Sequence, residues 1–427
     1  MPDKSNALHE FTPDEVWKWK LMEDKFDQVL KLHDYLEVRL SILQDRELIQ
    51  KGITALMQGK EPGSAGDRTL DLCRSDGDPN QLSLRPEGTI SVLQYTAKHY
   101  RKGDIHRYYY HGPMFRSQRG GVAEVTNQLG IELLGSDSVF SENEVISLGM
   151  RLLREMGFRE ASLRLNSYGC LNCRSDFYAD VCAYLEKHKK DYCQKCYEEL
   201  CANPFADTHC KLKSCQHDAH KGPQIVDYLC DNCQNHFRQI QKTQANLGHP
   251  YKVDPCLYKN FSYYNAAVFD FVINGGGHEV TAGGGGRYDF LSERITGRKI
   301  PAVGFYLDLD EIFRLMDNRG LFRVWEEEFA VYICAQSPNM DMMMLQIAQE
   351  LHTQNIKTVL SPENRSTDLE IKHARSHKCH LMVIIREDNI RDGKLLLHNL
   401  NREDQAYIPL NRVTEAIDIA RRSLKKQ

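Results

Sequence analysis

Three nearby stretches of the chain alternate apolar and polar positions: residues 82–89 (LSLRPEGT), 108–116 (YYYHGPMFR) and 128–135 (QLGIELLG). A period of two is typical of β-strands that bury one face and expose the other. We therefore predict that the three stretches are neighbouring strands of one antiparallel sheet.

Four polar side chains from these stretches are expected to converge on one face of that sheet: Glu87, Arg116, Gln128 and Glu132. A carboxylate can bind the amino group of a small zwitterion, and amide and carboxylate groups can bind a polar side chain. Burying an unpaired charge is costly, so several ionisable residues on one sheet favour a pocket. The alternative is a solvated sheet face with scattered ion pairs.

Helical patterns appear on either side of this region. Residues 12–35 have apolar positions at helical spacing, Thr12 can cap the first turn, and Glu15 completes a capping box. Residues 37–43 (EVRLSIL) predict a short strand, and residues 141–156 predict a second capped helix.

The last hundred residues alternate between apolar runs and helical patterns. The predicted strands are 329–334, 358–360 and 380–385, and the predicted helices are 340–352, 368–376 and 413–424. Strands that alternate with helices are typical of a parallel or mixed α/β sheet. A charged segment at 324–328 is the expected link to this module.

Composition limits the class of protein. A chain of 427 residues with 41% hydrophobic and 27% charged residues is an ordinary globular protein of two or three domains. Its net charge of −4 gives no general attraction to nucleic acid, so such a contact would need a local patch. The basic end at 421–426 is one candidate, although a charged tail on a last helix is more often just a solvated end. No apolar run can span a bilayer and no signal-peptide core begins the chain, so we expect a cytoplasmic protein.

Eight of the 14 cysteines lie in four close pairs within residues 163–236: Cys170 and Cys173, Cys193 and Cys196, Cys210 and Cys215, Cys230 and Cys233. In the cytoplasm such cysteines are thiols or metal ligands. Two pairs can present four thiolates tetrahedrally, as zinc requires. The charged stretches around them predict little apolar core, so a metal would supply folding energy. The alternative is a set of reduced, partly buried thiols.

A glycine run follows in the second half of the chain. Residues 266–273 (AAVFDFVI) predict a strand, and residues 283–287 (GGGGR) come after it. Glycine lets a backbone approach a ligand closely, but the same run could be a flexible hairpin end.

The motifs at 85–89 (RPEGT), 112–116 (GPMFR) and 128–132 (QLGIE) resemble the second signature of histidyl-tRNA synthetases, class II enzymes with an antiparallel catalytic sheet. The likeness extends over nearly the whole chain. It implies an α+β fold in which helices flank that sheet, with a cysteine-rich insertion and a C-terminal α/β domain similar to anticodon-binding domains. The implied divisions are a catalytic-like domain at 1–162 and 241–323, an insertion at 163–240, and the anticodon-binding-like domain at 324–427.

The resemblance also implies an amino-acid site. Glu87 would bind the α-amino group of histidine, Gln128 and Glu132 would make polar contacts, and Tyr263 and Tyr264 would contact the imidazole ring. Thr89 and Arg287 complete the predicted substrate-binding set, with the glycine run as the floor of the pocket. A tyrosine pair in a strand is otherwise ordinary core.

The implied ATP site departs from the family pattern. Arg116 remains as a catalytic candidate, and Lys259 stands where the family has a histidine-specific arginine, keeping the charge but losing the forked geometry. Two further phosphate arginines are replaced by Val122 and Glu124, the last one by Glu311, and a nucleotide-placing glutamate by Gln118. Adenylation brings two anions together and requires positive charge, and losing one preorganised charge costs roughly 10²–10³ in rate.

Two main hypotheses follow, and enzymatic activity stays open. The first is a synthetase-like protein that binds histidine or a related ligand, with tRNA or a protein as further partner, in the manner of the subunits that regulate ATP phosphoribosyltransferase. The second is a working histidine–tRNA ligase that uses ATP and Mg²⁺. An adenylating ligase for another acceptor is a third, which the missing arginines disfavour. Residues 12–43 correspond to the family's dimer-forming signature, so a homodimer is expected, although Ser41 replaces a usual proline.

Overall fold

The computed structural model of the chain describes residues 10–54, 69–73, 79–117, 123–205, 210, 212, 215, 222–259, 263–324, 329–337, 339–363 and 365–424. The chain forms two compact units, Met1–Phe322 and Arg323–Gln427. Among the helices of the described ranges, none combines the length and the apolar character that crossing a membrane requires.

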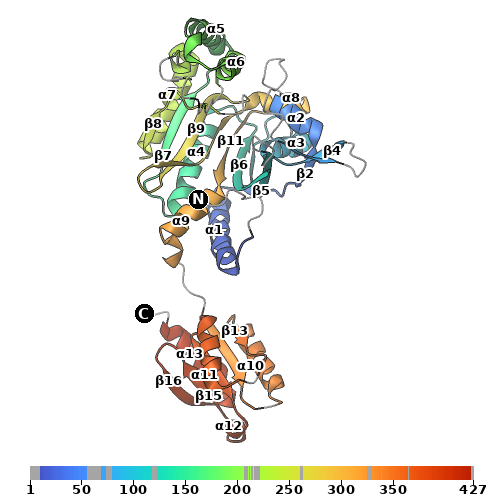
Figure 1. Cartoon of the computed structure of the whole chain (residues 1–427), viewed down its shortest axis with the longest axis vertical. Helices are drawn as coiled ribbons and strands as arrows, with labels where there is room; N and C mark the ends of the chain where they lie inside the picture. The colour runs from blue at the N-terminus through green and yellow to red at the C-terminus, as the bar shows by residue number, and fades with distance from the viewer. Residues whose placement is uncertain are drawn as a thin grey trace. The chain divides into compact units, whose positions relative to one another are not determined.

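Unit 1 is built around an eight-stranded sheet with strand order β1-β5-β6-β11-β10-β9-β7-β8 (Figure 1). Its five central pairings are antiparallel, and its two edge pairings are parallel. The strands are β1 (Leu36–Glu37), β5 (His106–Ser117), β6 (Ala123–Leu134), β7 (Ser162–Ser167), β8 (Tyr251–Val253), β9 (Asn265–Asn274), β10 (Glu279–Arg287) and β11 (Ala302–Asp308). The predicted antiparallel pairing of residues 108–116 with 128–135 is confirmed.

The first of the three predicted strands lies elsewhere. Residues 82–84 belong to β4 (Pro79–Leu84), which pairs with β2 (Leu43–Asp45) and β3 (Leu70–Cys73) in a separate small sheet. The backbone then crosses to the large sheet, where the Phe115 N–H donates to the Arg85 carbonyl at 2.9 Å. The prediction of three neighbouring strands was therefore wrong for this stretch, because its alternating pattern fits either sheet equally well.

The predicted strand at 37–43 is also divided. Its first residue lies in β1 and its last in β2, on different sheets. Between them the Val38 N–H donates to the Tyr109 carbonyl at 2.8 Å, and the Ile42 carbonyl accepts from the Arg85 N–H at 2.9 Å. The segment therefore bridges the two sheets instead of extending one strand.

Helices cover the large sheet of unit 1. The predicted N-terminal helix is α1 (Pro13–Leu32), and its Thr12–Glu15 capping box is present. The second predicted helix is α4 (Val139–Glu155), which begins earlier than expected because Ser138 caps it. The remaining helices of this part are α2 (Arg46–Thr54), α3 (Thr89–His99), α8 (Asp289–Thr296) and α9 (Leu309–Asn318). Alternate β6 residues pack into the core with α1, α4 and α9: Leu129, Ile131 and Leu133.

The cysteine-rich segment contains α5 (Leu171–Lys187), α6 (Gln194–Ala202) and α7 (Asp231–Asn246), with 3₁₀ turns at Lys189–Asp191 and Ile225–Tyr228. Figure 1 shows α5 and α6 at one end of unit 1 and α7 next to β8. The expectation of little apolar core in this segment was wrong, because the aromatic and aliphatic residues between the cysteine pairs are buried: Phe177, Val181, Leu185, Leu200 and Phe205.

Unit 2 has a five-stranded sheet with order β13-β12-β14-β15-β16. Its first three strands are parallel, and β15 and β16 are antiparallel additions, so the sheet is mixed. The strands are β12 (Ala330–Ala335), β13 (Lys357–Leu360), β14 (Leu381–Ile385), β15 (Lys394–Asn399) and β16 (Asp404–Pro409). The helices are α10 (Asp341–Thr353), α11 (Thr367–Ser376), α12 (Glu387–Arg391) and α13 (Val413–Leu424), and 3₁₀ turns lie at Leu321–Val324 and Leu410–Arg412. The three predicted strands and three predicted helices are confirmed, while β15, β16 and α12 were not predicted.

Candidate functional site

The candidate site lies on the face of the large sheet opposite the α1–α4 core. Side chains alternate between faces along a strand, so Glu132 and Gln128 of β6 share the face that Leu129 and Ile131 do not. The register places Gln128 opposite Gly112 of β5 and Asp308 of β11. The register therefore puts Arg116, Gln128 and Glu132 on one face of the sheet, whereas Glu87, which was expected to share that face, lies outside the strands just before α3.

Glu132 is the centre of a buried hydrogen-bond network and is only 2% exposed. Its Oε1 accepts from Thr89 Oγ1 at 2.8 Å and from Tyr110 Oη at 3.4 Å, and its Oε2 accepts from the Tyr288 hydroxyl. Burial raises the pKa of Glu132 to about 8. The sequence analysis identified Thr89 and Glu132 but missed Tyr110 and Tyr288. Tyr110 lies two residues before Gly112, and Tyr288 comes directly after the glycine run at 283–287.

Glu87 lies next to this network at the start of α3. Its two carboxylate oxygens accept from the backbone N–H groups of Thr89 at 2.8 Å and Ile90 at 2.9 Å. Burial raises the pKa of Glu87. Arg116 Nε donates to the Pro86 carbonyl at 2.9 Å, so this arginine is held against the peptide that carries Glu87.

Tyr263 and Tyr264 are buried in the same region, with ring centroids 4.8 Å apart. The Tyr263 ring is 6.0 Å from that of Tyr288, which contacts Glu132. Burial and the nearby carboxylates raise the pKa of both phenols well above the usual value. The structure therefore brings the predicted tyrosine pair together with Glu132.

Glycines on this face leave room for the site's own side chains. A Cβ at Gly304 would lie 1.9 Å from Glu132 Oε2, and a Cβ at Gly284 would lie 2.1 Å from Asp270 Oδ1. Neither contact is sterically possible, so larger residues would displace these carboxylates. The glycine run predicted as a pocket floor thus lies in β10 beneath the polar groups.

Lys259 is held by a carboxylate that the sequence analysis did not single out. Its ammonium group forms an ion pair with Asp270 of β9, and both side chains are largely buried. Its backbone N–H donates to Tyr168 Oη at 2.5 Å. Asp270 was recognisable as the lone charge in an otherwise apolar predicted strand.

Two carboxylates, those of Glu124 and Asp308, lie near Arg116, the predicted phosphate contact. Glu124 is directly opposite Arg116 in the β5–β6 register. Asp308 caps α9 by accepting from the Glu311 N–H at 3.0 Å, and burial raises the pKa of Asp308 to about 6. Glu311 Oε2 accepts from Arg314 Nε at 3.0 Å. Gln118 and Val122 lie outside the described residues.

Arg287 is bound within the chain. Its terminal nitrogens donate to the Ser136 and Ser138 carbonyls at 3.1 Å each, to Glu142 Oε2 at 2.7 Å and to Asp289 Oδ1 at 3.0 Å. These contacts join the end of β10 to α4. Its assignment to substrate binding stays a prediction.

The eight paired cysteines form two groups whose sulfur atoms all lie within 4.8 Å of one another inside each group. The outer cluster is Cys170, Cys173, Cys230 and Cys233, and the inner cluster is Cys193, Cys196, Cys210 and Cys215. The pairing is nested, because the first pair in sequence joins the last.

The clusters have the donor set and spacing of a zinc site. Sulfur–sulfur distances are 3.5 Å between Cys170 and Cys173 and 3.8 Å between Cys193 and Cys210. A tetrahedron with zinc–sulfur bonds of about 2.3 Å has edges of about 3.8 Å. Hydrogen bonds from the backbone N–H groups of Cys173 and Cys196 lower the pKa of the Cys170 and Cys193 thiols, respectively, to about 7.

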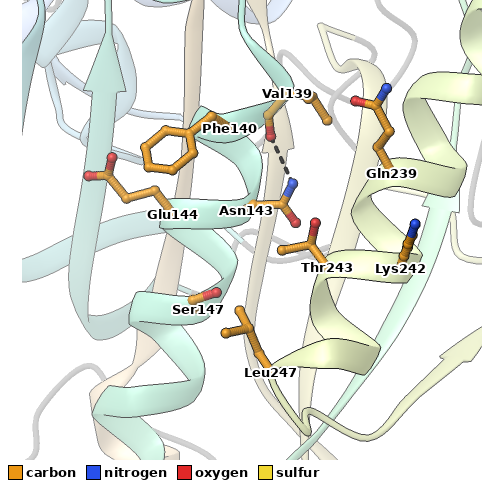
Figure 2. Close-up of a pocket in the computed structure, with 9 residues that line it drawn as sticks. All are labelled: Val139, Phe140, Asn143, Glu144, Ser147, Gln239, Lys242, Thr243 and Leu247. Atoms are coloured by element: carbon orange, nitrogen blue, oxygen red, sulfur yellow. Dashed lines mark hydrogen bonds between the residues drawn. The ribbon is translucent and has the colours of Figure 1, made fainter.

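A separate groove of about 460 Å³ lies between α4 and α7 (Figure 2). Its lining residues are Val139, Phe140, Asn143, Glu144, Ser147, Gln239, Lys242, Thr243 and Leu247. None of these belongs to the predicted amino-acid site. The groove marks where the last helix of the cysteine-rich segment meets the helix that carries Glu142.

Comparisons with known proteins cover both units. A family model described as histidyl-tRNA synthetase matches residues 7–312, and an anticodon binding domain model matches residues 330–418. The chain is 29% identical to a histidine–tRNA ligase of Caldicellulosiruptor bescii in an alignment over 413 residues that covers 94% of this chain and 95% of that protein. It is 30% identical to a histidine–tRNA ligase of Halothermothrix orenii over 413 residues, covering 96% and 97% of the two chains.

Solved structures share the fold. Apo histidyl-tRNA synthetase of S. aureus has a TM-score of 0.78 at 20% identity, covering 98% of this chain and 100% of that one. An ATP phosphoribosyltransferase regulatory subunit/histidyl-tRNA synthetase from Bacillus halodurans has a TM-score of 0.61 at 18% identity, covering 90% and 98% of the two chains. At these identities the likeness concerns the fold alone.

Proposed function

The chain belongs to the histidyl-tRNA synthetase family, and from that premise we propose that it binds histidine at the Glu132 site while its ATP site is impaired. The main support is the contrast between the part of the site predicted to bind the amino acid and the part predicted to bind the ATP phosphates. The amino-acid half keeps a satisfied set of carboxylates and tyrosines, whereas the phosphate half has gained carboxylates.

The amino-acid half suits a small zwitterion with an imidazole ring. Glu87 and Glu132 are buried carboxyl groups, and a cationic ammonium or imidazolium group that binds beside them would stabilise their ionised form. Tyr263 and Tyr264 offer ring faces and hydroxyls to an imidazole. Asp270 already holds Lys259, so the carboxylate of the ligand competes for that ammonium group.

The phosphate half opposes a polyanion. Arg116 is the predicted phosphate contact that remains, and Glu124 stands opposite it. Glu311 is neutralised by Arg314, which leaves that arginine engaged. A triphosphate would therefore approach with too little positive charge for its developing charge to be stabilised.

A regulatory or partner role fits this combination. The B. halodurans ATP phosphoribosyltransferase regulatory subunit/histidyl-tRNA synthetase shares the fold of this chain. Unit 2 matches an anticodon-binding domain, so tRNA is a second candidate partner. We place the protein in the cytoplasm as a homodimer joined through residues 12–43, where Leu32 and Leu36 are 74% and 62% exposed.

A working histidine–tRNA ligase is the second candidate function. It is favoured by relatives with that name which align over 94–96% of this chain. This function requires ATP and Mg²⁺, and it requires the nucleotide to use basic groups other than the replaced arginines. Releasing Arg314 from Glu311 would be one source of such charge.

ATP–pyrophosphate exchange driven by histidine separates the two candidates. We expect the unmodified protein to show exchange near background and to bind histidine without ATP in calorimetry. The double variant Glu124→Arg, Glu311→Arg should raise exchange at least tenfold, because it returns charge to both sides of the site. Glu350→Arg, an exposed residue of α10, is the matched charge-reversal control. Robust exchange by the unmodified protein would favour the ligase instead.

We further propose that both cysteine clusters bind zinc, which the four-thiolate geometry supports. Elemental analysis of protein purified without chelators should give two zinc ions per chain. The alternative of reduced thiols predicts no stoichiometric metal, and all eight cysteines would then react with a thiol reagent without a chelator.

A further inference from the structure

We propose that zinc in the outer cluster positions the histidine site, so that metal occupancy controls histidine affinity. The inference rests on the proposed binding of histidine and zinc and adds a coupling between them. Polar contacts link both helices that begin at the outer cluster to the site: α5 contacts the residues that follow β7 and precede β9, and α7 contacts α4, which binds the end of β10. Cys170 is the N-cap of α5, and Cys230 is the N-cap of α7.

The first connection runs through α5. Arg174 directly follows Cys173, a proposed zinc ligand, and is partly buried. Its terminal nitrogen donates to the Tyr264 carbonyl at 2.5 Å, and its Nε donates to the Tyr168 carbonyl at 3.2 Å. The guanidinium also lies over the Tyr168 ring, 5.7 Å from its centroid. A shift of the first turn of α5 therefore moves the backbone of a residue predicted to contact the imidazole.

Tyr168 extends this connection to both sides of the tyrosine pair. Its backbone N–H donates to the Ala266 carbonyl at 2.7 Å, at the start of β9. Its hydroxyl accepts from the backbone N–H of Lys259 at 2.5 Å. Lys259, before the tyrosine pair, and Ala266, after it, are thus both hydrogen-bonded to Tyr168, which lies two residues before Cys170.

The second connection runs through α7. His236 lies one turn after Cys233, with its Nε2 3.2 Å from Glu142 Oε1. Glu142 is fully buried, and its other oxygen binds Arg287 at the end of the glycine run at 2.7 Å. Farther along, Gln244 Nε2 donates to Asn143 Oδ1 at 2.9 Å. Figure 2 shows α4 and α7 side by side, with Asn143 on the α4 side.

Metal is the strongest link available at the junction of these helices. The two cysteine pairs are 57 residues apart from Cys173 to Cys230, and the N–H of Cys230 donates to the Cys173 sulfur at 3.2 Å. Thiolate coordination supplies free energy that one such hydrogen bond cannot. Because binding linkage is reciprocal, histidine must raise zinc affinity by the same factor as zinc raises histidine affinity.

The test compares histidine affinity, by isothermal titration calorimetry, of zinc-loaded wild-type protein and the double variant Cys170→Ser, Cys230→Ser. We expect the variant to retain one zinc ion of two and to bind histidine at least tenfold more weakly. Cys182→Ser is the matched control, since Cys182 is exposed and belongs to neither cluster. It should keep two zinc ions and wild-type affinity.

Two further measurements do not depend on the folding of the double variant. Arg174→Gln keeps all eight cysteines, so it should retain two zinc ions and still bind histidine about tenfold more weakly. Arg238→Gln, an exposed residue of α7, is its control. In the wild type, saturating histidine should slow the extraction of one zinc ion by a chromogenic chelator.

The outcomes separate the two levels of the proposal. The coupling alone would be overturned if Arg174→Gln had the same histidine affinity as the wild type. It would also be overturned if histidine did not change the rate at which the chelator extracts either zinc ion. A wild-type protein that binds zinc but no histidine would overturn the proposed function, and the coupling with it. Purified protein without stoichiometric zinc would overturn the metal assignment.

Discussion

At the residue scale, Glu132 shows how a charged group is kept inside the protein. Three hydroxyls, from Thr89, Tyr110 and Tyr288, point donors at its carboxylate, and no glycine replacement would fit beside it at Gly304. Burial nevertheless disfavours the charged form, which raises the pKa of Glu132 to about 8. In the protein without ligand, the carboxyl group of Glu132 therefore keeps a proton, which the binding of a cationic ligand can displace.

Histidine binding at pH 7 should release protons. The carboxyl of Glu132 is mostly protonated at that pH, and a bound cation favours the carboxylate, so the pKa falls on binding. Calorimetry in buffers with different ionisation enthalpies should show a release approaching about one proton per site. Glu132→Gln, which has no proton to lose, should abolish this release. A proton uptake by the wild type would contradict the assignment.

The raised pKa of Glu132 also determines the direction in which the free energy of unfolding of the ligand-free protein changes with pH. The ordinary pKa of a glutamate is near 4.5, so the unfolded chain loses this proton at lower pH than the folded protein does. The contribution to stability is therefore complete below about pH 4.5 and is lost as pH rises through about 8.

Gly304→Ala tests the steric part of the site. The new Cβ would lie 1.9 Å from Glu132 Oε2 and 2.4 Å from the Ile131 carbonyl. We expect the unfolding free energy to fall by about 1–3 kcal/mol, as for other overpacked positions, and histidine binding to be lost. Thermal and urea unfolding measure the first effect and calorimetry the second.

Gly222→Ala is the control for that substitution, because its Cβ would meet Tyr184 at an ordinary 3.4 Å. It should change stability by less than about 0.5 kcal/mol. Wild-type histidine affinity in Gly304→Ala would mean that Glu132 can move freely and is not a fixed part of the site.

At the element scale, one buried ion pair joins the large sheet to α4. Arg287 ends β10, and Glu142 lies in the first turn of α4 with no exposed surface. The α4 cap at Ser138 and the turn before it supply carbonyls to the same guanidinium. The burial of Glu142 is tolerated because arginine and His236 both face it, and together they lower the pKa of Glu142 against the effect of burial.

Arg287→Met should therefore be strongly destabilising. It leaves Glu142 buried beside a single histidine, and removing one member of a buried pair typically costs about 3–5 kcal/mol. Urea unfolding monitored by tryptophan fluorescence measures the change. The double variant Glu142→Gln, Arg287→Met should recover part of the loss, because it removes the uncompensated charge. Equal stability of Arg287→Met and the wild type would show that the pair contributes nothing.

At the scale of the whole molecule, exposed apolar side chains gather in one segment of the sequence. Leu32, Leu36, Ile42 and Leu43 are 74%, 62%, 47% and 43% exposed, and all lie between the end of α1 and β2. A contiguous patch of exposed apolar residues marks an interaction surface more often than scattered ones do, and these four are neighbours in the sequence. This segment is the one that resembles the family's dimer-forming signature.

The double variant Leu32→Glu, Leu36→Glu should convert a dimer into monomers. Two carboxylates cannot be buried at a symmetric interface without partners, so association should weaken by at least a hundredfold. Light scattering coupled to size-exclusion chromatography measures the mass. Leu247→Glu, at a position 51% exposed after α7, should leave the mass unchanged. A monomeric wild type at micromolar concentration would contradict the proposed dimer.

The sequence by itself determined the elements whose signals are local. The Thr12–Glu15 capping box, the alternation in β5 and β6 and the apolar runs of β12 and β14 were each readable because the residues that decide them are adjacent in the chain. The family motifs likewise carried Glu87, Gln128 and Glu132 as candidates.

Only the tertiary structure decided what depends on pairing between distant residues. An alternating stretch does not state which sheet it joins, so residues 82–84 were assigned to the wrong one. Four cysteine pairs permit several combinations, and folding selected the nested one by bringing the starts of α5 and α7 together. Tyr110, Tyr288 and Asp270 became site residues for the same reason, since the tertiary fold and not sequence distance places them beside Glu132 and Lys259.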